Sequence, residues 1–237
     1  MHIKDLIIIN NARHRPLLLA FALFSFCSYS IAASNPCGSL ANHDNFGPLD
    51  FNDPKDHQST PVYPQGKIQI VVGNHFTKNV EMLRGAGKGG GTVQGEIDYT
   101  LRRIPNHPRA LWALSRWVRK GGKLGMVGVG GWVRSIDCYF ERAFRWRPRD
   151  PAPHMIWAMH LHLTNKMKKA EKEYKIAEKL DPKNTELKYN MGLFYFDLKD
   201  YGRAYQYAQM AYDGGYPLPG LRNKLKGINK WPSNKDN

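Results

Sequence analysis

Acidic side chains are scarce in this chain of 237 residues, which carries 20 Asp and Glu against 35 Lys and Arg. A long apolar run is also missing, because the most apolar stretch, Leu17 to Phe26, is far shorter than the about 20 residues of a membrane-spanning helix. No Cys, Asp or Glu stands at zinc-like spacing from the His160-x-His162 pair, and no serine-centred nucleophile motif occurs. These absences argue against a metal centre and against nucleophilic catalysis. The apolar fraction of 42% is still adequate for a folded core.

The N-terminus has the pattern of a secretory signal peptide. Lys4, Arg13 and Arg15 precede the apolar stretch, and the small residues Ser30, Ala32 and Ala33 follow it. This order predicts a signal peptide over residues 1–33, cleaved near Ala32 or Ala33, and hence a periplasmic protein. An uncleaved signal that anchors the protein in the membrane is the alternative.

Removal of that segment would leave 32 basic against 19 acidic residues, a net charge of about +13. In an exported protein this excess favours an acidic protein, an anionic glycan or lipid headgroups as the partner over nucleic acid. A solvated basic surface that keeps the protein soluble explains the same charge without any partner.

Proline, alanine and aromatic residues recur at a fixed spacing in the second half of the chain. Pro148 and Pro182 are 34 residues apart, which is the period of tetratricopeptide repeats, whose units are pairs of antiparallel helices. Because one pair cannot bury its apolar face alone, neighbouring pairs must stack. The sequence therefore predicts an all-α helical solenoid. The small, aromatic and apolar repeat positions fall on Trp157, Ala158, Ala170, Tyr174 and Ala177, and then on Met191, Gly192, Tyr195, Ala204, Ala208 and Ala211.

The repeat frame divides the chain into units. We expect a degenerate unit over 74–107, with helices over His75–Arg84 and Gln94–Ile104, and further units over 108–150, 151–184 and 185–218. Residues 219–237 form a capping helix and tail. Pro105 precedes Pro148 by 43 residues, and the surplus falls in the glycine-rich stretch 121–131. Glycine costs about 1 kcal/mol per helical position, so this stretch is a loop between helices over about 108–120 and 133–146.

Residues 34–73 form an expected irregular arm. Its prolines at 48, 54, 61 and 64 forbid a regular helix. The arm is expected to pack on the solenoid through Phe46, Leu49, Phe51 and Tyr63. Lys67 to Val72 alternates briefly between polar and apolar residues, which predicts a short strand or an extended lead-in.

Cys37 and Cys138 are the cysteines that follow the signal segment. An oxidising compartment favours a disulfide between them. It would tie the arm to the second unit and close a loop of about 100 residues, which on chain-entropy estimates contributes up to about 4–5 kcal/mol. Two unpaired thiols are the alternative.

Short motifs run along nearly the whole chain after the signal segment. They are Cys37-Gly38, Phe46-Gly47-Pro48, His75-Phe76-Thr77, Asp98-Tyr99-Thr100-Leu101-Arg102, Pro105-Asn106-His107-Pro108, Phe140-Glu141-Arg142-Ala143, Asn190-Met191-Gly192-Leu193 and Tyr216-Pro217-Leu218-Pro219. With these motifs the chain resembles a group of exported proteobacterial tetratricopeptide-repeat proteins without assigned activity. The resemblance implies a periplasmic helical-repeat protein of a Gram-negative bacterium, and it brings no catalytic residues and no cofactor.

The concave groove is the candidate binding site, because the first helix of each unit lines it in tetratricopeptide arrays. Positions i, i+3, i+7 and i+10 of the helix over 108–120 share one stripe. Arginines bind carboxylates or phosphates by two-point contacts, and methionines and aromatics accept an apolar segment. A Trp112 that only packs against a neighbouring unit or the arm is the alternative. The candidate residues are Arg109, Trp112, Arg116 and Arg119, then Met155, Met159 and His162, then Tyr189, Leu193 and Phe196.

Three other patterns are weaker. The loop 85–91 lacks the Ser or Thr of a phosphate-binding loop after Gly87-Lys88, so it is interpreted as a flexible turn. His160 and His162 point in different directions on a helix and are expected to be surface or groove histidines. His75 with Glu81 and Asp98 is a conceivable acid–base set, although helix capping explains the same residues. Lys166, Lys168, Lys169 and Lys172 are expected on a solvated outer face.

The sequence thus predicts a non-enzymatic, exported scaffold, without cofactor or metal, whose groove binds an acidic or extended segment of another protein, in envelope assembly or export. Binding of anionic polysaccharide or lipid headgroups across the basic surface is the alternative. An enzyme that uses the glycine-rich loops is a third, weaker one. The sequence gives neither the identity of the partner nor the oligomeric state.

Overall fold

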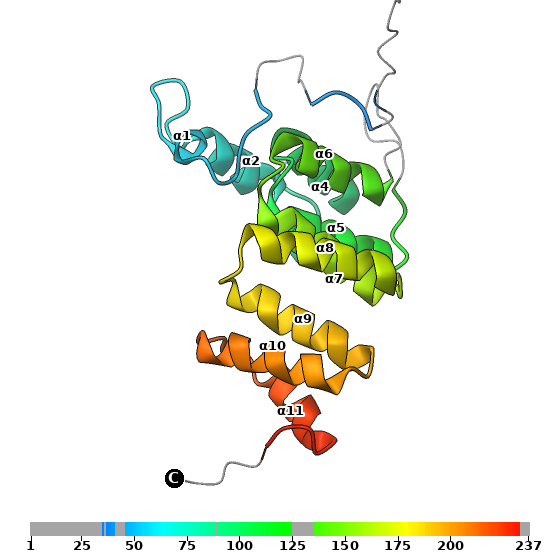
Figure 1. Cartoon of the computed structure of the whole chain (residues 1–237). Coiled ribbons are helices and arrows are strands. Elements are labelled where there is room, and N and C mark those ends of the chain that lie inside the picture. Colours follow the sequence, from blue (N-terminus) through cyan, green and yellow to red (C-terminus); the bar gives the residue numbers. More distant parts are fainter. Residues whose placement is uncertain (1–34, 36, 41–45, 89, 125–134, 233–237) are drawn as a thin grey trace, which may run out of the picture. The chain divides into compact units, whose positions relative to one another are not determined.

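The computed structural model describes residues 35, 37–40, 46–88, 90–124 and 135–232, all in the unit that begins at Asn35. This part of the chain contains eleven helices and no strand, so the fold is all-α, as predicted (Figure 1). None of these helices is long and apolar enough to cross a membrane. The predicted signal peptide, 1–33, lies outside the described residues. The helices are α1 (Pro54–His57), α2 (Lys67–His75), α3 (Lys78–Glu81), α4 (Val93–Arg103), α5 (Pro108–Arg119), α6 (Ile136–Trp146), α7 (Pro151–Leu163), α8 (Met167–Leu180), α9 (Thr185–Asp197), α10 (Tyr201–Asp213) and α11 (Gly220–Gly227).

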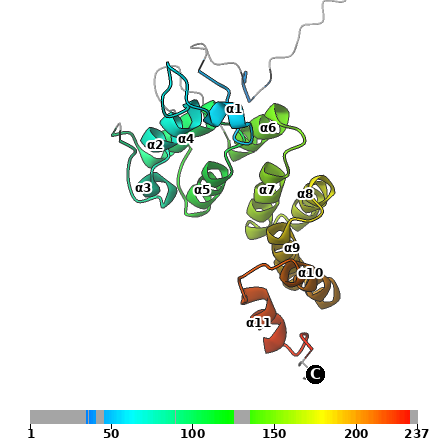
Figure 2. The ribbon, with the colours of Figure 1, turned by 90° about the vertical axis from the view of Figure 1, so that its left-hand side faces the viewer.

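The helices from α3 onward pack in an alternating order. Each contacts the next along the chain, and α3, α5, α7, α9 and α11 also contact one another in succession. The substantial contacts of α6, α8 and α10 are with these flanking helices. In Figure 2, α3, α5 and α7 accordingly lie on one side and α4, α6 and α8 on the other. The odd-numbered helices therefore form one continuous row, here called the first-helix row.

The period of the sequence repeat is also a period of the backbone. The first residues of α7 and α9 are separated by the same distance along the chain as Pro148 and Pro182, and so are the first residues of α8 and α10. The turns within these pairs match, because Asn165 and Lys199 have φ values of 60° and 62°. In each turn, the next backbone N–H donates to the carbonyl of a buried residue near the end of the preceding helix, Leu161 or Tyr195, at 2.8 and 2.9 Å. These two helix pairs are repeats of one structural unit.

The connections from one helix pair to the next also share one conformation. This includes the connection after α6, which follows the longer unit with the glycine-rich stretch. The C-cap residues that directly follow α4, α6 and α8 are Ile104, Arg147 and Asp181, whose φ and ψ lie at −131° and 79°, −135° and 83°, and −139° and 81°. A proline follows each of them. The residue two places after that proline then caps the next helix, because the side chains of His107, Asp150 and Asn184 accept hydrogen bonds from backbone N–H groups.

The core follows this frame. The same two positions ahead of Pro105, Pro148 and Pro182 are occupied by a large and by a small residue in each case. All six side chains are at most 1% exposed. Large and small side chains thus alternate along α4, α6 and α8 where they pack on the first-helix row. The large residues are Ile97, Phe140 and Tyr174, and the small ones are Thr100, Ala143 and Ala177.

Two sequence predictions in the N-terminal part are wrong. Lys67 to Val72 is neither strand nor extended lead-in, since it belongs to α2. Ile68 and Val71, three positions apart, are both buried, against Leu49 and Ile104. A helix over His75–Arg84 is replaced by the end of α2 and the single turn α3. Leu83, at φ 59°, follows that turn and ends it.

The arm is therefore more regular than expected and contains both α1 and α2. Pro54 begins α1 rather than preventing it, because Asp53 caps the helix and proline is tolerated in the first turn. The helix expected over 133–146 begins at Ile136, and most of the stretch 121–131 lies outside the described residues. The capping helix is present as α11.

The arm is fixed to the helix pairs by a buried polar cluster. The Asn106 side chain is fully buried and donates to Asp50 Oδ1 at 2.7 Å and to Asp150 Oδ2 at 2.9 Å. Its oxygen accepts from the backbone N–H of Phe51 at 3.0 Å. Arg147 pairs with Asp50, and this bond helps to lower the pKa of Asp50 in spite of burial, which acts in the opposite direction. Two successive connections between helix pairs thus bind the same short segment of the arm.

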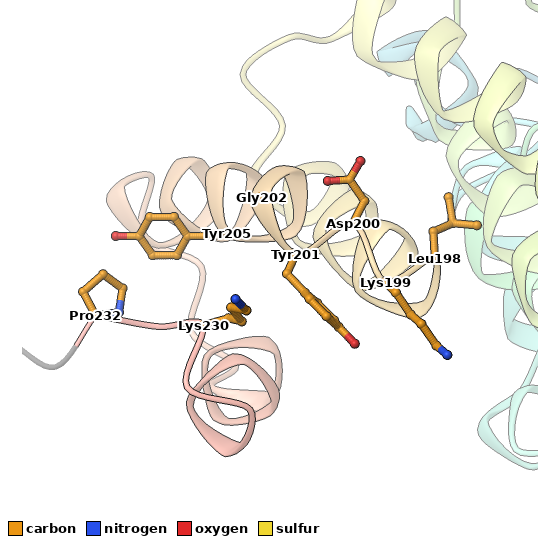
Figure 3. Close-up of a pocket in the computed structure, with 8 residues that line it drawn as sticks. All are labelled: Leu198, Lys199, Asp200, Tyr201, Gly202, Tyr205, Lys230 and Pro232. Atoms are coloured by element: carbon orange, nitrogen blue, oxygen red, sulfur yellow. The ribbon is translucent and has the colours of Figure 1, made fainter.

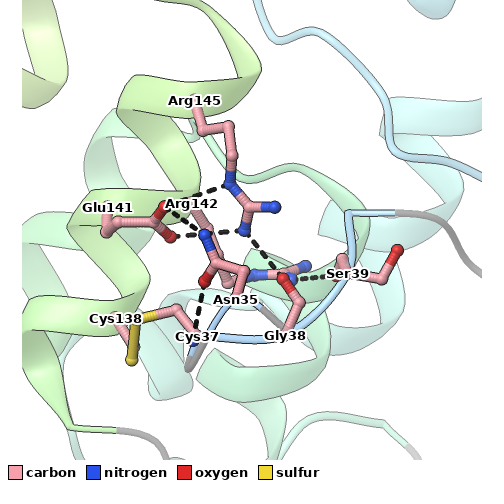
Figure 4. The surroundings of a disulfide bond; sticks show 8 residues. All are labelled: Asn35, Cys37, Gly38, Ser39, Cys138, Glu141, Arg142 and Arg145. Atoms are coloured by element: carbon pink, nitrogen blue, oxygen red, sulfur yellow. Dashed lines mark hydrogen bonds and ion pairs between the residues drawn. A yellow bond between two sulfur atoms is a disulfide. The ribbon is translucent and has the colours of Figure 1, made fainter. Parts of the chain in front are cut away.

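A disulfide joins the start of the arm to α6, and it is the pair considered in the sequence, Cys37 and Cys138. Figure 4 shows Glu141 between Asn35 and Arg145, which bond to it at 3.0 and 3.1 Å. Arg145 also donates to the carbonyl of Gly38 at 2.7 Å. The described residues around the disulfide therefore follow the surface of α6.

Candidate functional site

The predicted arginine stripe lies on α5, but two of its members have partners. Arg109 Nε donates to Glu81 Oε1 at 2.8 Å, and its guanidinium pairs with the same carboxylate. This ion pair lowers the pKa of Glu81 and raises that of Arg109. Arg116 donates to the backbone carbonyl of Glu81. α3 thus neutralises one end of the stripe.

The other end of the stripe is less compensated. Arg119 is exposed and forms no ion pair with any residue that the structure describes. Its guanidinium lies 5.3 Å from the centre of the Trp112 ring, in a cation–π contact. Burial of the group, and then the neighbouring Arg116, lower the pKa of Arg119. Trp112 is half-buried and packs on the core, in line with the alternative given for it, yet part of it stays accessible beside Arg119.

The candidate residues on α7 differ in their accessibility. Met159 is half-buried and packs against the core. Met155 and His162 are only 9% and 8% exposed, so both are largely unavailable to a partner. His162 Nε2 lies 3.0 Å from Asp197 Oδ2 and fixes α7 to α9. Burial lowers the pKa of His162, against the opposing effect of that carboxylate.

On α9, the segment at the start of α11 covers the predicted residues. Tyr189 is 9% exposed and stacks on Tyr216 at 4.4 Å between ring centres. Lys224 lies 5.0 Å from the centre of the Phe196 ring. Leu193 is half-buried against the core. The accessible candidate residues are therefore concentrated on α5, with Met159 and the exposed parts of Leu193 and Phe196 beyond it.

His160 and His162 are buried between helices, so the prediction that they lie on the surface or in the groove is wrong. His160 is 2% exposed; its Nδ1 lies 3.0 Å from Ser115 Oγ on α5. Burial lowers the pKa of His160 to about 4. His162 points instead to α9. Two residues two apart on α7 thus contact the helices on either side of it, and no group of three metal-ligating side chains occurs in the described part of the chain.

The conceivable acid–base set does not come together. His75 Nδ1 lies 2.7 Å from Glu96 Oε2, whereas Glu81 pairs with Arg109. Asp98 accepts from Arg102 and from the Tyr139 hydroxyl, at 2.8 and 2.6 Å. Each carboxylate has a separate partner on its own or a neighbouring helix.

Two glycines of the loop 85–91, Gly87 and Gly91, have a packing role. A Cβ atom at Gly87 would lie 2.5 Å from the Asn74 carbonyl oxygen and 2.9 Å from the Glu96 carboxylate, and one at Gly91 would lie 2.7 Å from Glu96. The described part of this loop thus approaches Glu96 closely, which side chains would prevent.

A depression of about 710 Å³ lies near the C-terminal end of the described chain (Figure 3). Tyr201, Tyr205, Lys199 and Lys230 line it, and in Figure 3 the Asp200 carboxylate points away from Lys230. Asp200 instead caps α10 and bonds to Arg203. The depression is open, and the acidic residue of its described lining, Asp200, is bound to Arg203 and not to either lysine.

Sequence reasoning missed Glu81 as the partner of the stripe and Asn106 as the centre of the arm cluster. Glu81 lies in the preceding unit, too far from Arg109 along the chain to give a local signal. Asn106 offers one, because it stands directly after the repeat proline and before a helix cap. No family model matches this chain, and no curated protein matches it either. The function must therefore be inferred from the geometry.

Proposed function

We propose that this protein is an exported, non-enzymatic tetratricopeptide-type scaffold that binds an acidic, extended segment of a partner protein on the first-helix row. The period that the backbone shares with the prolines of the sequence supports the repeat class. The observation that carries the binding site is Arg119, an arginine without an ion pair in the described part of the chain, which lies on Trp112 and near Arg116. Crowded positive charge that is partly desolvated favours a carboxylate as its ligand.

A titration with labelled peptides tests this proposal. The probe is an acidic peptide of about 12 residues with an apolar residue at every fourth position, compared with a peptide in which lysine replaces each acidic residue. Arg119→Glu should weaken binding of the acidic peptide about tenfold, which corresponds to ~1.4 kcal/mol. Trp112→Ala should weaken it as well, because the stacked guanidinium loses its support.

Lys172→Glu is the matched control. It changes the net charge by the same amount as Arg119→Glu, at an exposed position on α8. Binding of the acidic peptide to the first-helix row should therefore change only through the net charge of the protein. Equal losses for Arg119→Glu and Lys172→Glu would show that net charge, not the α5 surface, determines binding.

The second candidate is an anionic glycan or lipid headgroup bound to the basic outer surface. Lys166, Lys168, Lys169 and Lys172 are all exposed around the start of α8, and none forms an ion pair with a described residue. Binding of this kind should fall steeply with ionic strength, and Lys172→Glu should reduce it more than Arg119→Glu does. Vesicles containing anionic lipid, compared with neutral vesicles, make that comparison direct.

A further inference from the structure

The depression near the C-terminal end is a further candidate binding site, and none of its lining residues belongs to α5 or α7 (Figure 3). Its volume of about 710 Å³ lies within the roughly 300–1,000 Å³ of ligand sites. It is formed by the start of α10, the turn before that helix and the segment that follows α11. The lining residues that bear on its chemistry are Lys199, Asp200, Tyr201, Tyr205 and Lys230.

Two tyrosines of α10 form one wall of the depression. Tyr201 and Tyr205 are four positions apart, so they lie on the same face of the helix. Both side chains are half-buried, and neither hydroxyl is hydrogen-bonded to a residue that the structure describes. The two side chains therefore offer ring surface for packing together with hydroxyl groups that can bond to a ligand.

The available charges of the depression are positive. Lys199 and Lys230 are exposed, and neither forms an ion pair with a residue in the described part of the chain. In Figure 3, the Tyr201 ring lies between these two lysine side chains, and the Asp200 carboxylate points away from Lys230. That carboxylate accepts a hydrogen bond from Arg203 Nε at 2.6 Å. An anionic group beside Tyr201 would therefore meet two ammonium groups, while the acidic residue of the described lining is already bound.

The segment after α10 adds to this positive charge. Residues 214–232 contain four basic residues and no acidic one. Because like charges on one segment raise the potential over the neighbouring surface, this part of the molecule attracts anions. The four residues are Arg222, Lys224, Lys226 and Lys230.

Both sides of the depression are held in place by the fold. On one side, the backbone N–H of Lys199 donates to the Phe196 carbonyl at 2.9 Å. On the other side, the Trp231 and Tyr205 rings meet edge to face with their centres 5.2 Å apart. This contact holds Lys230, the residue before Trp231, beside α10. A site that is formed before its ligand arrives has a smaller entropy cost of binding.

We propose that this depression binds an anionic oligosaccharide, with a pyranose ring packed on Tyr201 and Tyr205 and its carboxylate between Lys199 and Lys230. An open depression suits a chain that continues beyond it at both ends, and a hydroxyl-rich ring matches a wall that combines ring surface with hydroxyl groups. Lysine binds a hydrated carboxylate as a point charge, whereas arginine favours planar two-point binding. The site is separate from the peptide-binding surface on the first-helix row and from the lysines of α8, and it does not depend on either.

Titration of the full-length chain with trigalacturonate at low ionic strength, followed by NMR, tests the proposal. This probe should bind with a Kd of roughly 1 mM and shift amide signals within 198–205 and 228–232. Its methyl ester has the same rings without the charge, and N-acetylated, C-amidated triglutamate has the same charge without the rings. Each of these two controls should bind at least about fivefold more weakly.

Lys230→Gln should weaken trigalacturonate binding about threefold, whereas Lys172→Gln, the same charge change at an exposed position on α8, should leave it nearly unchanged. Tyr201→Leu should weaken it too, with the thermal unfolding temperature recorded to exclude loss of the fold. Equal affinity for either control compound, equal losses in Lys230→Gln and Lys172→Gln, or the absence of shifts at about 10 mM trigalacturonate would each overturn the proposal.

Discussion

The buried amide of Asn106 is the centre of the polar cluster that helps to hold the arm to the helix pairs. It bonds to two carboxylates and one backbone N–H, which belong to the arm and to the next connection between pairs. Asn106→Ala would leave these groups without that partner in a buried place, which should cost roughly 2–4 kcal/mol of the free energy of unfolding. Urea denaturation measures this loss.

Asn52→Ala is the control for this prediction. Asn52 donates to the same Asp150 oxygen at 2.8 Å but is exposed, so water replaces it. We expect a loss below about 1 kcal/mol. Equal losses in the two variants would contradict a central role for Asn106.

Two buried histidines should make stability depend on pH. Burial lowers the pKa of His107 and of His160 to about 4 each, from the usual 6.5. The unfolded chain therefore takes up protons at a higher pH than the folded chain. The stabilisation is fully present above about pH 6.5 and is lost as the pH falls towards 4, by up to ~1.4 kcal/mol per pH unit for each group.

His107→Asn tests this dependence without removing the cap. His107 Nδ1 accepts from the Ala110 N–H at 3.1 Å, and an Asn oxygen does the same at helix N-termini. The slope of unfolding free energy against pH between about 4.5 and 6.5 should fall in the variant. An unchanged slope would show that His107 does not titrate in this window on unfolding.

The candidate stripe on α5 could be predicted from the sequence because helical spacing places Arg109, Trp112, Arg116 and Arg119 on one face. Its electrostatic state could not. Glu81 neutralises part of the stripe by pairing with Arg109, and these two residues are too far apart in the sequence for any local pattern to reveal the pair. The burial of Tyr189 depends similarly on Tyr216, which belongs to the segment before the next helix.

At the scale of the helices, the prolines and small residues of the repeat predicted most elements. α4 and α5 begin and end within one residue of the expected bounds, and α7 and α9 begin at the first residues of the expected units 151–184 and 185–218, because proline termination and helix capping are local effects. The short strand or extended lead-in predicted over Lys67 to Val72 is wrong. A short alternation fits an extended segment, whereas the burial of Ile68 and Val71 at helical spacing depends on contacts with the arm. The secondary structure of short segments near the arm is therefore determined by tertiary contacts.

Two glycines of the last full pair should respond oppositely to alanine. A Cβ atom at Gly192 would lie 2.4 Å from Leu221 Cδ2 and 3.3 Å from the Ala204 carbonyl oxygen, where α9 meets α10 and α11. Gly192→Ala should destabilise the fold by about 1–3 kcal/mol, as overpacking does. Thermal unfolding measures the change.

Gly202→Ala is its matched control in α10. Its nearest neighbour would be Asp200 Oδ1 at 3.8 Å, an ordinary contact, and the position is exposed. Alanine should stabilise α10 by about 0.5–1 kcal/mol. Destabilisation by both variants to the same extent would contradict close packing as the reason for glycine at 192.

On the scale of the described molecule, five helices form one row that presents side chains from every unit to the same side. Glu81 of α3 pairs with Arg109 at one end of the row, and α11 with its lead-in covers Tyr189 and Phe196 at the other. The accessible candidate residues therefore lie between these ends, mainly on α5. The proposed partner segment would therefore be short, with its acidic part bound at Arg119 on α5 and its apolar part next to Met159 on α7.

Photo-crosslinking maps this binding directly. A benzophenone placed in the middle of the acidic peptide should crosslink to α5 and α7, within 109–119 and 155–163, and the crosslinks should disappear in Arg119→Glu while they persist in Lys172→Glu. Crosslinks confined to α8, over 166–179, or equal labelling by the lysine-substituted peptide would contradict binding of an acidic segment on the first-helix row.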